Sequence, residues 1–294
     1  MRVTEKTIFD NAARSAGSLR ERLQRAVNEN ATGLRVQHPW DDPGVTAPIV
    51  GHRLSQSRND ALGVAAQRAD DEIQATDSAL GALTDTLSRA RQLAMQMAND
   101  SYGPSDRAIT SEEVRALFRD SIGLLNTRIG NRYVFAGFQD DAPAFDENGV
   151  YQGDAGVRQV EAFNGVMQSV SLRGDVVATG ATGGPDWLGT LSALQTAMTG
   201  NDVAGIRATL DQLDDGIEHL STSRAQLGAA SNTLNVAVNT ARENVDTEKA
   251  NISRLSEADI FESATKLALA QRALEAALTA SARSFDLSLL DKLR

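Results

Sequence analysis

Cysteine is absent from this 294-residue sequence, and aromatic residues are scarce. Without cysteine the chain can form no disulfide bond, no thiolate zinc site and no cysteine nucleophile. Aromatic side chains make up 4% of the residues although 41% are hydrophobic, so alanine, leucine and valine supply most of the apolar surface. This composition favours thin contacts between helices over a thick globular core.

Positive charge is also in short supply, with 29 Lys and Arg against 39 Asp and Glu and a formal net charge of −10. Nucleic-acid binding needs clustered positive charge, so no nucleic-acid partner is expected. No apolar run approaches the roughly 20 residues of a membrane helix, and no membrane insertion is expected. The opening 23 residues lack the apolar stretch of a secretory signal peptide. These absences indicate a cytoplasmic protein or export by a machine that reads another signal.

The strongest positive signal is a helical seam, in which apolar residues alternate at three- and four-residue spacing. The first seam includes Leu19, Leu23 and Ala26. A second seam runs without a break over residues 62–97. At about 1.5 Å per residue it is roughly 50 Å long.

The C-terminal third repeats this spacing. One seam keeps a single register over residues 213–255, with polar interruptions at Arg224, Ser231 and Glu248. After a slight shift a last seam follows, with apolar residues at Ile260, Ala264, Leu267, Leu274, Leu278 and Phe285. Such long seams predict coiled-coil-like packing. An ordinary helical bundle has the same local spacing and stays an alternative.

Glycine and proline mark the helix limits. Gly33 stands where a left-handed residue commonly ends a helix, and Pro43 suits the first turn of the next. Pro104 interrupts that second helix, and Ser105 or Thr110 can cap a third helix that ends near residue 130.

The middle of the sequence favours β-structure. Residues 133–138 form a β-favouring run, and Asn148-Gly149 and Asn164-Gly165 are hairpin turn signals. Pairing across the second turn predicts one apolar face made of Val157, Phe163, Val166, Val170 and Leu172. Helices resume at Trp187. The expected fold is mainly α, a long coiled-coil-like helical rod formed by the N- and C-terminal segments, with a small inserted β domain.

The two end seams need a helix to cover them, because apolar surface in water is unfavourable. The first and last helices are therefore expected to pair. The predicted segments are an N-terminal helix and loop (1–40), the first part of the rod (41–130), the β insert (131–186), the second part of the rod (187–255) and a C-terminal helix (256–294). An alanine-lined helix pair gains little at ~25 cal/mol per Å², so neighbouring subunits are expected to complete its burial.

Two groups of motifs resemble one known family. The loop after the first helix resembles that of the flagellin family at Thr32, Gly33, Arg35, Asp41, Asp42 and Pro43. Residues 257–290 also resemble this family. A second motif resembles the hook-associated protein 3 branch, which forms the junction of hook and filament, at Arg132, Tyr133, Phe135, Ala136, Gly137 and Phe138.

The resemblance implies an extracellular subunit of the bacterial flagellum, exported unfolded through the flagellar type III apparatus. It implies an adaptor between a ring of hook-associated protein 1 and the flagellin filament. Its partners would be hook-associated protein 1, flagellin, copies of itself in a ring and an export chaperone. Flagellin itself is the nearest alternative, and a cytoplasmic coiled-coil binding module is a second one.

The candidate assembly residues are seam positions near the two ends. They are Leu19, Leu23, Ala26, Leu267, Leu274, Leu278 and Phe285. Each of them could instead belong to an intramolecular core, and the spacing leaves both interpretations open.

Catalytic and metal chemistry have little support. His38, Asp41, Asp42 and His52 are the only cluster of metal-ligand types, but Asp42 suits a helix cap and Asp41 a turn. A structural role is favoured for this cluster. No nucleophile elbow or phosphate-binding glycine motif is present, so neither enzyme activity nor a cofactor is expected. His219 is expected on a solvated helix face.

Overall fold

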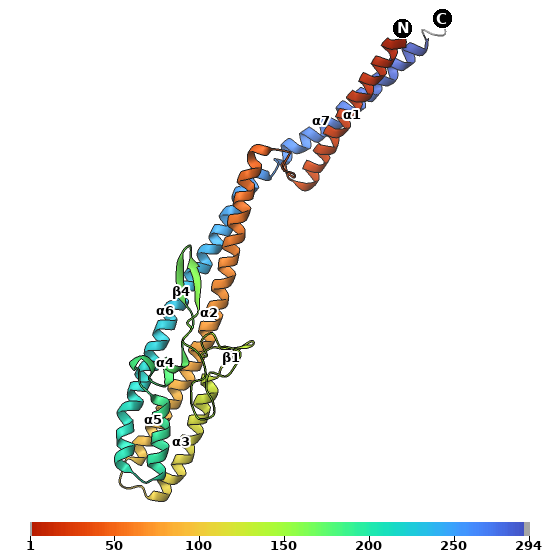
Figure 1. The fold of residues 1–294 in the computed structure, drawn as a ribbon. Coiled ribbons are helices and arrows are strands. Elements are labelled where there is room, and N and C mark those ends of the chain that lie inside the picture. Colours follow the sequence, from red (N-terminus) through yellow and green to blue (C-terminus); the bar gives the residue numbers. More distant parts are fainter. Residues whose placement is uncertain (1, 291–294) are drawn as a thin grey trace. The chain divides into compact units, whose positions relative to one another are not determined.

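A computed structural model describes the backbone of residues 2–290 and the side chains of residues 6, 7 and 10–282. Long helices dominate it, with four short strands (Figure 1). The helices are α1 (Arg2–Thr32), α2 (Pro43–Met97), α3 (Pro104–Leu125), α4 (Gly174–Ala178), α5 (Trp187–Thr199), α6 (Val203–Ser256) and α7 (Ile260–Leu290). The strands are β1 (Arg128–Ile129), β2 (Arg132–Tyr133), β3 (Gln159–Phe163) and β4 (Val166–Ser169). The predicted mainly α fold with a small β part is confirmed.

The chain divides into two compact units. The terminal unit contains residues 1–58 and 244–294, and the central unit contains residues 59–243. The predicted terminal segments 1–40 and 256–294 both fall in the terminal unit, together with one end of α2 and one end of α6. Both unit boundaries lie inside continuous helices, where seam spacing gives no sign of a division.

The helix limits follow the glycine and proline signals in most places. Gly33 has a φ of +68° directly after α1, and α2 begins at Pro43. The third helix begins at Pro104, where the Asp106 side chain accepts a hydrogen bond from the Gly103 N–H. The expectation of a cap at Ser105 or Thr110 is therefore wrong, because both lie inside α3.

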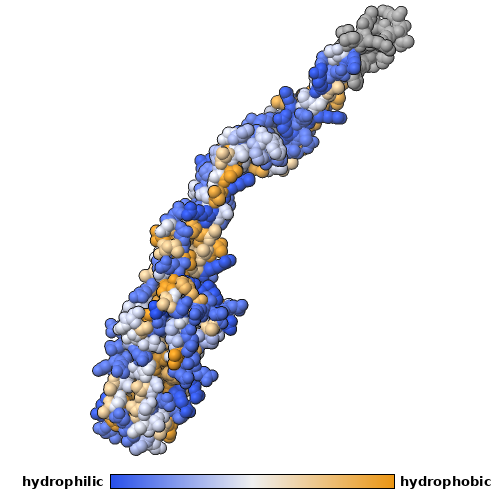
Figure 2. Space-filling model, in the orientation of Figure 1, coloured by the Kyte–Doolittle hydropathy of each residue, from blue (hydrophilic) through white to orange (hydrophobic). Residues whose placement is uncertain are grey.

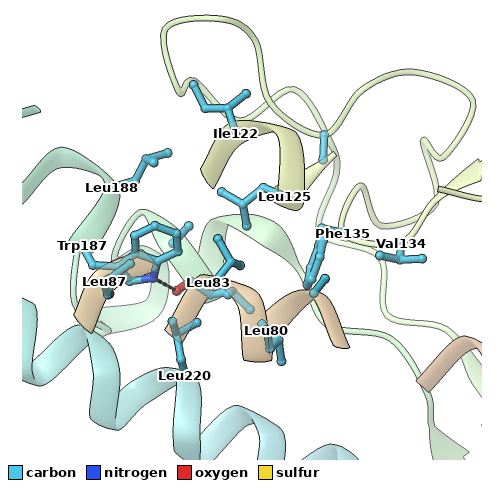
Figure 3. Close-up of a cluster of buried hydrophobic side chains, with 14 of the residues drawn as sticks. Leu80, Leu83, Leu87, Ile122, Leu125, Val134, Phe135, Trp187, Leu188 and Leu220 are labelled. Atoms are coloured by element: carbon cyan, nitrogen blue, oxygen red, sulfur yellow. Dashed lines mark hydrogen bonds between the residues drawn. The ribbon is translucent and has the colours of Figure 1, made fainter. Parts of the chain in front are cut away.

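The core of the central unit forms around the seam of α2. Leu80, Leu83 and Leu87 are completely buried. Figure 3 shows them between Leu220 of α6 on one side and apolar residues of α3, α5 and the insert on the other. The Trp187 ring of α5 closes this cluster, and its Nε1–H donates to the Val177 carbonyl at 2.6 Å. The predicted seams of α2 and α6 are confirmed here.

The polar interruptions in α6 each meet a polar residue of α2. Arg224 pairs with Asp77 at 2.8 Å, and Ser231 donates a hydrogen bond to Asp70 seven residues further along each helix. One residue number rises by seven as the other falls by seven, so α2 and α6 are antiparallel. These polar pairs at seam positions disfavour any other alignment of α2 against α6, because a shift of one helix along the other would separate the partners.

The insert contains fewer strand residues than expected. β3 and β4 form the hairpin predicted at Asn164-Gly165, whereas the Asn148-Gly149 turn is flanked by an isolated bridge between Phe145 and Tyr151 instead of two strands. A bulge between Glu161 and Phe163 shifts the β3–β4 register. The predicted common apolar face is therefore wrong: Val170 is buried, whereas Val166 is 51% exposed.

His219 was expected on a solvated helix face, and that expectation is wrong. Its Nε2 lies 3.0 Å from the carbonyl oxygen of Val176 in α4, and the residue is half-buried. The short helix α4 could not be predicted from apolar spacing, because five residues hold little more than one turn.

Candidate assembly surfaces

The first and last helices of the terminal unit lie side by side (Figure 1). Near the end of α1 the Asn30 amide donates to the Ser263 hydroxyl at 3.1 Å. Lys266 bridges Glu29 and Glu262 at 3.3 and 3.1 Å. These contacts fix the level at which α7 starts beside α1.

The predicted end-seam residues are covered to different extents. Ala26 is buried, and Leu19, Leu23, Leu267 and Leu274 are half-buried. Leu278 is 50% exposed, so a role as intramolecular core is contradicted for this residue. Phe285 lies in α7, but its side chain is outside the described residues. Within the described part, the α1–α7 pair covers its own seam only in part.

The position of the last seam also differs from the expectation. Ile260 is 73% exposed, whereas the neighbouring Ser263 is buried. The inward stripe of α7 therefore runs through Ser263, Leu267 and Leu274. An alanine-rich helix has several faces of similar hydropathy, so spacing alone does not select the covered one.

A second apolar stripe on α7 faces solvent. Its residues follow the same four- and three-residue spacing, and all are exposed: Leu269, Ala273, Ala276 and Ala280. Leu269 alone is 60% exposed. A helix with two apolar stripes can pack against two neighbours, and α1 occupies only one stripe.

The loop between α1 and α2 is held by its own polar groups. The Asp41 carboxylate accepts hydrogen bonds from the backbone N–H groups of His38 and Gln37, which lower the pKa of Asp41. Arg35 pairs with Asp42 at 2.8 Å, and that hydrogen bond lowers the pKa of Asp42. The family-motif residues of this loop therefore fix its shape.

The same loop and α1 enclose a groove of about 630 Å³, here called the Trp40 groove. It is lined by Arg25 and Glu29 of α1 and by Leu34, Arg35, His38 and Trp40 of the loop, among others. The His38 and Trp40 rings are stacked, with centroids 4.6 Å apart. Sequence reasoning missed this groove, although a tryptophan in a turn-rich loop could have drawn attention to it.

A buried carboxylate ties the insert to α2. Glu72 is 6% exposed, and its carboxylate lies 2.9 Å from Arg132 and 3.0 Å from Arg158. Arg158 also pairs with Asp140 at 2.9 Å. The motif residue Arg132 therefore has a structural partner on the long helix. Glu72 and Arg158 were missed because the pair is remote in sequence.

The rest of this motif builds the centre of the insert. Phe135 and Ala136 are completely buried, and Gly137 has a φ of +74°. A Cβ atom on Gly137 would stand 2.1 Å from Asp154 Oδ1, so no larger residue fits without a shift. Phe138 is 62% exposed, and its N–H donates to Asp154.

Tyr151 completes this arrangement. Its hydroxyl oxygen lies 2.9 Å from the Asp154 carbonyl oxygen and 3.2 Å from that of Phe135, so its single proton is shared between these two acceptors. Burial is the main cause that raises the pKa of Tyr151 to about 12. The hydroxyl therefore stays protonated at neutral pH, as its donor role requires.

The four candidate metal ligands do not converge on one point, although His38 Nδ1 lies 3.5 Å from the Asp41 carboxylate. His52 lies 2.5 Å from Glu248 of α6, while Asp41 and Asp42 are used inside the loop. Among the described residues no group of three or more His, Asp or Glu could hold a metal ion.

None of the described helices is both long and apolar enough to span a membrane. The visible face in Figure 2 shows scattered hydrophobic patches between hydrophilic ones.

Comparison with known proteins places the two ends of the sequence in one family. The bacterial flagellin N-terminal helical region matches residues 4–140, and the bacterial flagellin C-terminal helical region matches residues 210–293.

Two curated relatives align over most of the chain. Flagellar hook-associated protein 3 of Salmonella typhimurium is 23% identical over 299 residues, which cover 94% of this chain and 94% of that protein. Flagellin of Bacillus subtilis is 27% identical over 273 residues, which cover 88% of each. The solved structure of the flagellar junction protein of Legionella pneumophila has a TM-score of 0.56 at 16% identity, covering 71% of this chain and 99% of that one. It shares the fold.

Proposed function

This chain belongs to the flagellin family, and from that premise we propose that it is a structural subunit that joins the hook to the filament of the bacterial flagellum. The observation that carries the proposal is the partly covered helix pair of the terminal unit. Leu269 and Leu278 are exposed there although they lie at seam spacing. Burial in an assembly is the simplest way to remove such stripes from water.

The relatives favour the junction over the bulk filament. The Salmonella protein that aligns over 94% of both chains is named hook-associated protein 3. The Legionella protein of the same fold is named a flagellar junction protein. The motif at Arg132, Phe135 and Gly137 resembles the same branch, and each of these residues has a defined place in the insert.

An adaptor of this kind has two unlike neighbours along the flagellar axis. We expect hook-associated protein 1 on the hook side, flagellin on the filament side and copies of this chain in a ring between them. Export through the flagellar type III apparatus, with a chaperone before secretion, fits the same role. The exposed stripes of the terminal unit are the surfaces expected to meet these neighbours.

Flagellin itself is the second candidate, favoured by the 27% identity to the Bacillus subtilis protein. The two candidates differ in copy number. A junction subunit is needed in about one ring per flagellum, whereas a filament subunit is needed in thousands of copies.

Deletion of the gene tests the proposal. A junction subunit is needed to retain flagellin, so its loss should leave hooks present, filaments absent and flagellin in the medium. Electron microscopy and immunoblots of cell and medium fractions measure this, with complementation by the intact gene as the control. Normal filaments in the deletion strain would reject the junction role. Absence of all flagellin from both fractions would identify the chain as the filament subunit.

A further inference from the structure

The Trp40 groove is preformed and has an aromatic wall. Trp40 is 73% exposed, whereas the other tryptophan, Trp187, is completely buried. Hydrogen bonds to Asp41 hold the backbone on which His38 and Trp40 stand. A rigid exposed tryptophan beside a groove is typical of a binding hot spot, because such a residue offers large apolar area at little entropic cost.

A matching protrusion lies at the start of α7. Phe261 is 86% exposed, the highest value among the large hydrophobic residues of the described part, and Ile260 is 73% exposed. The Asp259 carboxylate accepts hydrogen bonds from the N–H groups of Phe261 and Glu262 at 2.8 and 3.1 Å. The protruding phenyl ring therefore stands on a fixed helix terminus.

The groove and the protrusion lie at the same level of the terminal unit. Leu34 of the groove forms a backbone bridge with Glu257, and the Ala258 N–H donates to the Gly33 carbonyl at 2.8 Å. A neighbouring copy displaced sideways, with little shift along the helices, would thus bring its Phe261 to the level of this groove. Contacts of this head-to-tail kind close into rings when the rotation permits.

We propose that Phe261 of one copy docks against Trp40 in the groove of the next copy. The inference rests on the proposed function, because it names the contact that would link copies within the ring. Arg25 and Arg35 line the groove together with Glu21, Glu29 and Asp41, so the proposed contact is an aromatic one, between Phe261 and the stacked His38 and Trp40 rings.

Cysteine cross-linking in the assembled flagellum tests the contact, because the chain has no cysteine of its own. The test variant carries Trp40→Cys and Phe261→Cys in the full chain, expressed in the deletion strain. The control carries Trp40→Cys and Glu275→Cys, since Glu275 is exposed on the same helix about 21 Å further along at 1.5 Å per residue.

After mild oxidation, isolated hook–junction particles are separated on non-reducing gels. Docking predicts a ladder of dimers and higher species for the 40/261 pair, at least tenfold stronger than for the 40/275 pair. Equal ladders from both pairs would overturn the proposal. So would a cross-link confined to single chains, or the absence of any cross-link, in particles that retain the protein.

A second measurement covers the case in which the cysteine variant fails to assemble. A benzoylphenylalanine residue in place of Phe261 keeps the aromatic bulk, and light links it to whatever it touches. Docking predicts a dimer of this chain with the adduct in residues 21–41. An adduct with flagellin, hook-associated protein 1 or a chaperone, or a dimer linked elsewhere, would overturn the inference. The proposed junction role would survive each of these results, because it is tested by the deletion.

Discussion

The central and terminal units use the same helical spacing but cover it differently. Every member of the continuous hydrophobic core lies between Ala66 and Val238, inside the central unit. In the terminal unit the buried hydrophobic residues among the described ones are Ala26, Ile49 and Val245. The difference arises from the number of layers. In the central unit α3, α5 and the insert cover α2 and α6, whereas in the terminal unit α1 and α7 pack on each other. Equal apolar spacing therefore does not imply equal burial. The apolar surface that α1 and α7 leave uncovered is available for assembly.

The two tryptophans give the largest expected contrast. Trp187→Ala should destabilise the chain by about 3–5 kcal/mol, because it empties a packed site and orphans the Val177 carbonyl. Trp40→Ala, the matched change at a 73% exposed site, should change unfolding by less than about 0.5 kcal/mol. Urea unfolding followed by circular dichroism measures both. Similar losses from the two substitutions would contradict the contrast between the units.

A charge placed at the exposed residue Leu278 of α7 should act on assembly and leave folding intact. Leu278→Asp should leave the free energy of unfolding within about 0.5 kcal/mol of the parent, while reducing retention of the protein on flagella at least tenfold. Ile109→Asp is the control, because Ile109 is 70% exposed on α3 of the central unit. Immunoblots of flagella against medium give the ratio. Equal retention of the two variants would remove Leu278 from the assembly surface.

The two arginines on Glu72 should contribute unequally to stability. Arg158→Met should cost about 1–3 kcal/mol, because the Arg158 side chain is 16% exposed and its loss leaves a buried carboxylate short of a partner. Arg132→Met should cost about 0–1 kcal/mol, since that side chain is 48% exposed and solvent replaces it. Urea midpoints of both variants and of the double variant measure the coupling. A larger loss for Arg132→Met would reverse the assigned roles.

The smallest effect is a pH dependence in the terminal unit. The hydrogen bond with His52 is the main cause that holds the pKa of Glu248 below its ordinary value of 4.5. The unfolded chain therefore takes up this proton first on acidification. The hydrogen bond between Glu248 and His52 therefore stabilises the fold fully at pH values above the ordinary pKa. This stabilisation is lost as the pH falls through the lowered pKa of Glu248 in the folded chain. Glu248→Gln should flatten the fall in urea midpoint below about pH 5. An unchanged slope would show that this pair contributes nothing.

Sequence spacing identified the seams that other layers cover. Leu80, Leu83 and Leu87 are large, regularly spaced and interrupted by polar residues, so only one face of α2 can be buried. In α7 the same reasoning selected Ile260 and Leu278, which are exposed. Alanine residues lie on several faces of this helix and make those faces nearly equivalent in hydropathy. Which face is covered there depends on α1, and pairing geometry is not contained in the local spacing of either helix.

Contacts between residues far apart in the sequence could not be predicted either, because local spacing does not contain the pairing geometry. The bulge before Phe163 shifts a hairpin by one residue, and one residue reverses which side chains face the core. Glu72 follows Asp70 and Asp71 and stands directly before the seam residue Ile73, and its partner Arg158 lies 86 residues further along. A carboxylate in such a position signals a missing partner, but the sequence does not say which arginine provides it.

The position of Glu72 restricts how the insert can be exchanged. Grafting a foreign domain between α3 and α5 would remove Arg132 and Arg158 together and leave the Glu72 carboxylate without either of its arginine partners. A chimera should therefore tolerate the graft only if it keeps both guanidinium groups or replaces Glu72 by an uncharged residue. Glu72 of α2 therefore requires the arginines of this insert, and α2 and the insert must be exchanged together.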